Sequence, residues 1–163
     1  MDRQKILVLG VGNILFTDEG IGVHTVRYLL ENATFPDTVR LLDGGTLGIG
    51  LMDAIMDCDL LIVLDAVLGS QKPGSLYRLE GEDLRRSLSF KDSMHQTDLV
   101  DTLLYCELAG HRPEAVILGM EPQDYRSMGL ELSPPCQAAV PGLAQKLLDE
   151  LKSRGVSVSH CQS

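Results

Sequence analysis

The chain has 163 residues, of which 44% are hydrophobic and only 4% aromatic, which predicts one domain, residues 1–163, with an aliphatic core and excludes intrinsic disorder. The formal net charge of −9 argues against nucleic acid or an anionic membrane surface as a partner, and the apolar runs are shorter than the ~18 residues that span a bilayer. The charged first residues lack the pattern of a signal peptide, so we expect a cytoplasmic protein.

Strand-like and helix-like patterns alternate along the first part of the chain. A short buried strand is predicted at Lys5–Leu9, followed by glycines and a helix from about Gly20 to Glu31. A second strand at Thr38–Leu42 precedes a helix at Leu47–Asp57, and the most apolar run, Leu60–Val67, predicts a third strand. This alternation predicts a mostly parallel sheet with helices on both faces.

The second half of the chain adds two strands and two helices. The strand that follows the turn at Lys72–Ser75 is expected to be antiparallel, because a parallel crossover needs about a dozen residues or more. A helix is predicted from Thr97 to Ala109, then a strand at Glu114–Glu121 and a final helix that begins with prolines. Pro141 is expected to break or kink that last helix, because a helix interior accommodates its ring poorly.

Three carboxylates follow the ends of neighbouring strands. Right-handed crossovers place the first strand between the second and the third, so that the carboxyl ends of these strands border one crevice. Glu19 follows the first strand, Asp43 the second, and Asp65 ends the third. Because open α/β sheets bind their ligands in such a crevice, we expect the three carboxylates to meet there.

These acids also have ordinary structural interpretations. Asp18 or Glu19 could cap the helix and complement its dipole, and Asp43 could form a turn before two glycines. Asp65 is harder to explain in this way, because a charge without a partner is costly inside the apolar run "LLIVLDAVL". For Asp65 the sequence therefore favours a functional role.

The glycines of "GVGN" resemble the start of a dinucleotide-binding loop, with Asp43 as the ribose-binding acid. However, Leu15 replaces the third glycine of that motif, and Glu19 would repel a pyrophosphate at the helix N-terminus. Converging carboxylates instead favour a cation, and an imidazole would complete a ligand set suited to nickel or zinc.

Four histidines are candidates for that imidazole. His24 lies within the first helix, His111 near a helix C-terminus, and His160 in a tail that we expect to be frayed. His95 lies in the loop "KDSMHQTD" and can swing over the crevice, although spacing alone does not select it. The sequence has no HExxH, GxSxG or CxxC motif. The scattered cysteines are expected to be buried thiols: Cys58, Cys106, Cys136 and Cys161.

The motifs "GVGNILFTDEGIGVH", "LLDGGT", "LIVLDAV" and "MHQTDL" occur in this order over nearly the whole chain. Together they resemble the hydrogenase maturation proteases, the endopeptidases that remove the C-terminal extension from the large-subunit precursor of nickel–iron hydrogenases. The resemblance implies a three-layer α/β/α sandwich around a five-stranded, mostly parallel mixed sheet with one antiparallel strand. It also implies cleavage just after the His or Arg that closes the last cysteine motif of the precursor.

By this resemblance, the metal ligands of the family fall on Glu19, Asp65 and His95, and Asp43 falls where the family has an acid near the site. Members of the family act only after nickel has been inserted into the precursor. The implied partner is therefore a nickel-loaded precursor, and we expect nickel to arrive with it, with zinc or cadmium able to substitute. Glu19 or Asp43 is then a candidate general base, while Gly44 and Gly45 would let a substrate backbone pass closely.

Two other classes of function stay open at this point. The chain could be a nickel-binding chaperone or scaffold that cuts nothing, or an enzyme that depends on a nucleotide. Cleavage of a loaded precursor separates the first alternative from a protease, and a comparison of metals with nucleotide cofactors in thermal-shift experiments tests the second.

Overall fold

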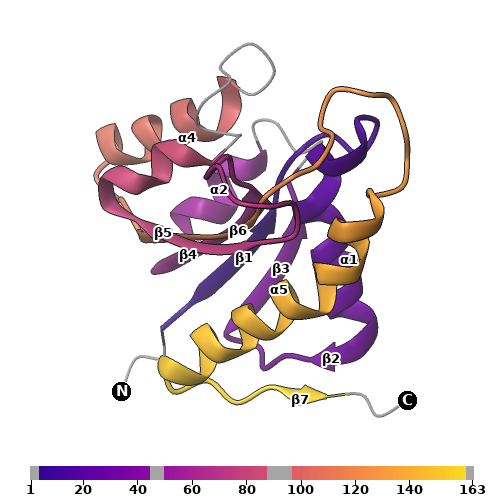
Figure 1. Ribbon diagram of the computed structural model, residues 1–163. Coiled ribbons are helices and arrows are strands. Elements are labelled where there is room, and N and C mark those ends of the chain that lie inside the picture. Colours follow the sequence, from indigo (N-terminus) through magenta and orange to yellow (C-terminus); the bar gives the residue numbers. More distant parts are fainter. Residues whose placement is uncertain (1–3, 45–49, 88–96, 161–163) are drawn as a thin grey trace.

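The computed structural model describes residues 4–44, 50–87 and 97–160 and shows a sheet between two layers of helices (Figure 1). In this part of the chain the sheet has five strands in the order β3-β1-β4-β6-β5. From one edge to the other these are β3 (Val39–Asp43), β1 (Ile6–Gly10), β4 (Leu60–Ala66), β6 (Glu114–Met120) and β5 (Leu76–Glu80).

The strand directions confirm the predicted topology. β1 pairs in parallel with both β3 and β4, and β4 pairs in parallel with β6, whereas β5 pairs antiparallel with β6. β1 therefore lies between the second and third long strands, as right-handed crossovers require. β5 is antiparallel because the connection from β4, which contains the turn at Lys72–Ser75, is shorter than the dozen or so residues that a parallel crossover needs.

Helices cover both faces of the sheet and complete the predicted three-layer sandwich. One face packs against α1 (Ile21–Asn32) and α5 (Pro134–Ser153), and the other against α2 (Gly50–Met56) and α4 (Thr97–Leu108). Strand side chains alternate between these two apolar cores: in β4, Leu60, Ile62 and Leu64 lie on the α1/α5 side, and Leu61 and Val63 on the α2/α4 side.

Smaller elements complete the described residues. They are the short 3₁₀ helices η1 (Thr17–Gly20) and η2 (Gly81–Arg86) and a two-stranded antiparallel sheet of β2 (Ala33–Thr34) and β7 (Ser159–His160). The tail that we expected to be frayed thus pairs with the chain after α1. None of the helices in the described residues is long and apolar enough to cross a bilayer.

The last helix differs from the expectation for Pro141. α5 is continuous through this residue, so the expected break does not occur. Pro141 is exposed, so its ring faces solvent, where the carbonyl that loses an N–H partner can be hydrated. The buried side chains of Val140 and Leu143 hold the helix to the core on either side of the proline.

Candidate active site

The candidate site lies at the carboxyl ends of the parallel strands, a border of the sheet that we call the carboxyl edge. Gly10 at the end of β1 is level with Asp43 of β3 on one side and with Leu64 of β4 on the other. η1, which carries Glu19, follows β1 and contacts β4, which carries Asp65. The structure therefore brings the elements of all three predicted carboxylates to one edge of the sheet.

Two glycines allow the chain after β1 to turn back over this edge. Gly12 has φ of +116°, and a Cβ atom there would lie 1.8 Å from the carbonyl oxygen of Glu19. A Cβ atom on Gly22 would lie 1.9 Å from the carbonyl oxygen of Leu64, because the first turn of α1 packs directly on the end of β4. The glycines of "GVGN" and "EGIG" thus serve close packing, and this packing places Glu19 at the edge.

Asp65 has the environment of a positioned carboxylate. Its side chain is fully buried, and its Oδ2 accepts a short hydrogen bond from the hydroxyl of Ser87, which is also fully buried. A backbone bridge between Val67 and Ser87 holds the two segments together. Ser87 belongs to no recognisable sequence motif, so the sequence analysis did not identify it.

Asp43 lies at the same edge but projects from the other face of the sheet. Asp43 lies on the same face of its strand as Val39 and Leu41, which pack in the α1/α5 core. Asp65 lies on the same face of β4 as the residues that pack in the α2/α4 core. The Asp43 carboxylate is 4.0 Å from the guanidinium of Arg27 on α1, and its side chain is 42% exposed. The structure therefore does not direct Asp43 and Asp65 toward the same side.

The glycine that follows Asp43 is closely packed. A Cβ atom on Gly44 would lie 2.6 Å from the side chain of Leu9.

Asp18 is not a helix cap. The N-cap residues are Phe16 for η1 and Gly20 for α1, so neither predicted acid caps these helices. The fully buried Asp18 carboxylate instead accepts hydrogen bonds from the backbone N–H groups of Gln123, Asp124 and Ser133 and from the Ser133 hydroxyl, at 2.7–2.9 Å. It thereby ties η1 to the chain that follows β6.

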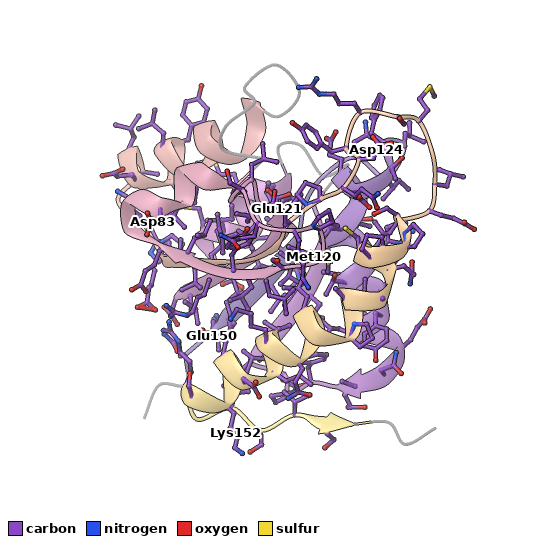
Figure 2. All side chains as sticks on the ribbon, viewed as in Figure 1. Asp83, Met120, Glu121, Asp124, Glu150 and Lys152 are labelled. Carbon is purple, nitrogen blue, oxygen red and sulfur yellow. The ribbon has the colours of Figure 1, made fainter. Side chains whose placement is uncertain are left out.

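Glu121 is a further buried carboxylate at this end of the sheet, and sequence reasoning did not single it out. Its Oε1 accepts hydrogen bonds from the N–H groups of Gly69 and Gln71, at 2.9 and 3.1 Å, and from the hydroxyl of Tyr77, at 2.5 Å. Figure 2 labels Glu121 next to Met120, the last residue of β6. Like Asp65, it lies at the carboxyl end of an apolar run in the sequence, and this is the signal that could have identified it. Its hydrogen bonds fix the segment that follows β4.

The histidines are distributed over the molecule. His95 lies outside the described residues, and no group of three His, Cys, Asp or Glu side chains that could hold a metal occurs among the described ones. The ring Nε2 of His111 is 2.7 Å from the carbonyl oxygen of Cys58, just before β4 and thus at the opposite edge of the sheet. His160 lies in β7. The pKa of His24 on α1 is lowered, first by burial and then by the charge of Arg27.

The cysteines have the buried environment that we predicted. Cys58, Cys106 and Cys136 are buried and free, while Cys161 lies outside the described residues. Burial raises the pKa of all three described thiols, to about 12 for Cys58. A thiol with so high a pKa is a poor nucleophile at neutral pH.

Comparisons with known proteins agree with this architecture. Residues 23–150 match the family described as hydrogenase maturation protease. The sequence is 39% identical over 158 residues to the hydrogenase expression/formation protein HoxM of Azotobacter vinelandii, covering 96% of this chain and 76% of that protein. It is 36% identical over 155 residues to the hydrogenase 2 maturation protease of Escherichia coli, covering 94% of each.

A solved structure shares the fold. The hydrogenase maturating endopeptidase HybD from E. coli superimposes with a TM-score of 0.85 at 35% identity, covering 96% of this chain and 97% of that one. The match to the family covers more than half of the chain, and the sheet order, the antiparallel strand and the layers are those expected for its fold. The chain belongs to the hydrogenase maturation protease family.

Proposed function

We propose that this protein is an endopeptidase that removes the C-terminal extension from the large-subunit precursor of a nickel–iron hydrogenase after nickel has been inserted. The observation that carries the proposal is Asp65, a fully buried carboxylate at the carboxyl end of β4, oriented by Ser87 beside the turn that bears Glu19. Family membership and the endopeptidase named in the E. coli structure support this assignment.

The donor set fits a divalent transition metal. Glu19 and Asp65 offer carboxylate oxygens, and His95, which lies outside the described residues, would add an imidazole nitrogen. We propose these three residues as the ligands, with nickel supplied by the precursor as part of the substrate and zinc or cadmium able to replace it. A metal bound there would polarise the scissile carbonyl and lower the pKa of an attacking water.

Glu19 is the better candidate for the general base. Asp43 projects toward the α1/α5 side, away from Asp65, and its carboxylate lies 4.0 Å from the guanidinium of Arg27. Glu19 is partly buried and lies on η1, an element that contacts the strand that carries Asp65. We therefore assign proton transfer at the attacking water to Glu19 and keep Asp43 as the alternative base. Ser87 would orient the Asp65 carboxylate by donating its hydroxyl hydrogen.

Intact-mass measurement of a purified precursor tests the proposal. The precursor is prepared with and without nickel and incubated with the parent protein or with the Glu19→Gln variant. We expect the parent to shorten only the loaded precursor, by the mass of its C-terminal extension, and the variant to leave it intact. A loaded precursor that binds the parent but keeps its full mass would instead identify a nickel-binding chaperone.

A further inference from the structure

The Asp18 carboxylate joins two parts of the chain that are 105 to 115 residues apart in the sequence. Its Oδ2 accepts hydrogen bonds from the N–H groups of Gln123 and Asp124 and from the Ser133 hydroxyl, and its Oδ1 accepts one from the Ser133 N–H. The N–H of Asp18 in turn donates to the carbonyl of Asp124, at 2.8 Å. Burying a carboxylate is costly without such donors, and hydrogen bonds to a charged acceptor are among the stronger ones. The described residues thus contain a closed clamp between η1 and segment 123–133.

The residue before Asp18 is held in a strained conformation by the same segment. Thr17 has φ of +46°, which is uncommon for a β-branched side chain. Its N–H donates to the carbonyl of Gly129 at 2.9 Å, and its hydroxyl to the carbonyl of Ser127 at 2.7 Å. The N–H of Gly129 donates back to the carbonyl of Leu15. Figure 1 shows this orange segment beside the indigo turn that contains η1.

These contacts act next to a proposed metal ligand. Glu19 directly follows Asp18, and its carbonyl oxygen packs where a side chain on Gly12 would lie. The backbone of Glu19 is therefore fixed from one side by the turn after β1 and from the other by the clamp. A ligand or base must be held to within about 0.5 Å of its productive position.

We propose that Asp18 is a positioning residue: by clamping segment 123–133 to η1, it sets the position of Glu19 for metal binding and for peptide cleavage. This inference rests on the proposed function. Asp18 touches neither substrate nor metal, so its loss is expected to lower kcat and metal affinity more than affinity for the precursor.

Glu150 provides a matched control. It is also a buried carboxylate, with 8% of its side chain exposed, and it lies near the end of α5. Its partners are Arg78, at 2.7 Å, and Arg154, at 3.1 Å. Replacing Glu150 by Gln removes a buried charge at a distance from the site, which reproduces the loss of stability without disturbing η1.

The test measures kcat and KM for the loaded precursor and cadmium affinity by calorimetry, both well below the melting temperature, and thermal unfolding gives the melting temperature of each variant. Asp18→Asn puts amide hydrogens against N–H donors and is expected to lower kcat about 100-fold, as a misplaced catalytic group does, with KM within about twofold of the parent. Ser133→Ala, which removes only the hydroxyl donor, is expected to lower kcat and cadmium affinity less, and Ser133→Thr to restore both. If Asp18→Asn does not fold, the Ser133 pair decides.

The outcomes separate the two proposals. If the parent does not shorten a loaded precursor, the proposed function is wrong. If the parent cleaves but the Ser133→Ala and Asp18→Asn variants keep the kcat and cadmium affinity of the parent, or lose no more than Glu150→Gln at equal loss of melting temperature, Asp18 is structural only. A loss of kcat in the Asp18 and Ser133→Ala variants, absent in Glu150→Gln and reversed in Ser133→Thr, establishes the positioning role.

Discussion

Buried carboxylates occur in two regions of the molecule, and different partners stabilise them. Glu150 near the end of α5 is paired with Arg78 and Arg154. Asp18 and Glu121, at the carboxyl edge of the sheet, accept hydrogen bonds from backbone N–H and hydroxyl groups, and no ion pair within residues 4–44, 50–87 and 97–160 includes either of them. Figure 2 labels Glu121 and Glu150 in these two regions.

The difference has an electrostatic consequence. A guanidinium neutralises the carboxylate that it binds, whereas neutral donors satisfy the lone pairs of the oxygens but leave the negative charge in place. Within residues 4–44, 50–87 and 97–160, the donors to Asp18 and Glu121 are therefore neutral groups that hold these carboxylates rigidly and add no positive charge, which favours a cation nearby. The far end of α5 uses its carboxylate as an element of the scaffold.

The largest expected effect comes from the proposed ligands at the carboxyl edge. Glu19→Gln, Asp65→Asn and His95→Ala should each lower processing of the loaded precursor by more than about 100-fold, since even groups that only orient a metal ligand contribute about 10- to 100-fold. The fold should survive, and Asp65→Asn should not destabilise it, because it removes a charge from an apolar strand. Precursor processing, cadmium affinity and circular dichroism check this prediction.

The same ligand set predicts a dependence on pH. Metal ligands bind in their deprotonated forms, so cadmium affinity should weaken as pH falls through the imidazole range near ~6.5. The proposed site would be wrong if Glu19→Gln, Asp65→Asn and His95→Ala all stay folded, bind cadmium like the parent and still trim a loaded precursor.

An intermediate effect is expected at Ser87. Ser87→Ala removes the hydroxyl that orients the Asp65 carboxylate and should weaken cadmium binding by about 10- to 100-fold. The control is Ser153→Ala, which removes a hydroxyl that donates to the carbonyl of Glu150 in the other region. Equal cadmium affinities for the two variants, measured by calorimetry, would mean that the Ser87 contact serves folding alone.

The smallest effect on processing is expected at Glu150. Hydrogen bonding from Arg78 holds the pKa of this carboxyl below its ordinary value of 4.5. The charged form therefore contributes stability that is present above pH 4.5 and is lost as pH falls through the lower, folded-state pKa. Glu150→Gln should cost about 1–2 kcal/mol in the free energy of unfolding at pH 7 while processing continues, since the side chain of Arg78 is 37% exposed and water can solvate the charge that is left. Urea unfolding from pH 7 to acid checks this, since the parent and the variant should converge at low pH and a constant difference would contradict the assignment.

Much of the fold could be predicted from local patterns. Local patterns of apolar residues placed all five long strands, and the short connection before Leu76 predicted the antiparallel one. The break allowed at Pro141 does not occur, because the exposure of this residue and the packing of its neighbours decide whether a helix continues. The side chains of Asp43 and Asp65 point to opposite faces of the sheet. This follows from strand alternation once the core residues of each face are known, but the sequence alone does not say which face each strand residue packs on.

The site was predictable only where its signal is local. Asp65 interrupts an apolar strand, and the same reasoning applied to "EAVILGME" would have identified Glu121. Asp18 next to a helix start looks like a cap, but its partners lie 105 to 115 residues away in the sequence. No local pattern encodes such partners. The assignment of His95 rests on the family resemblance, and the residue lies outside the described ones.

The clamp also determines when the site is assembled during synthesis. Glu19 and Asp65 leave the ribosome early, but the donors to Asp18 lie at Gln123, Asp124 and Ser133. Contacts across so long a stretch form only after the intervening chain has been made and its loop closed. A nascent chain that ends before Gln123 therefore carries Glu19 without the donors that fix η1, so the proposed site is complete only once segment 123–133 has emerged.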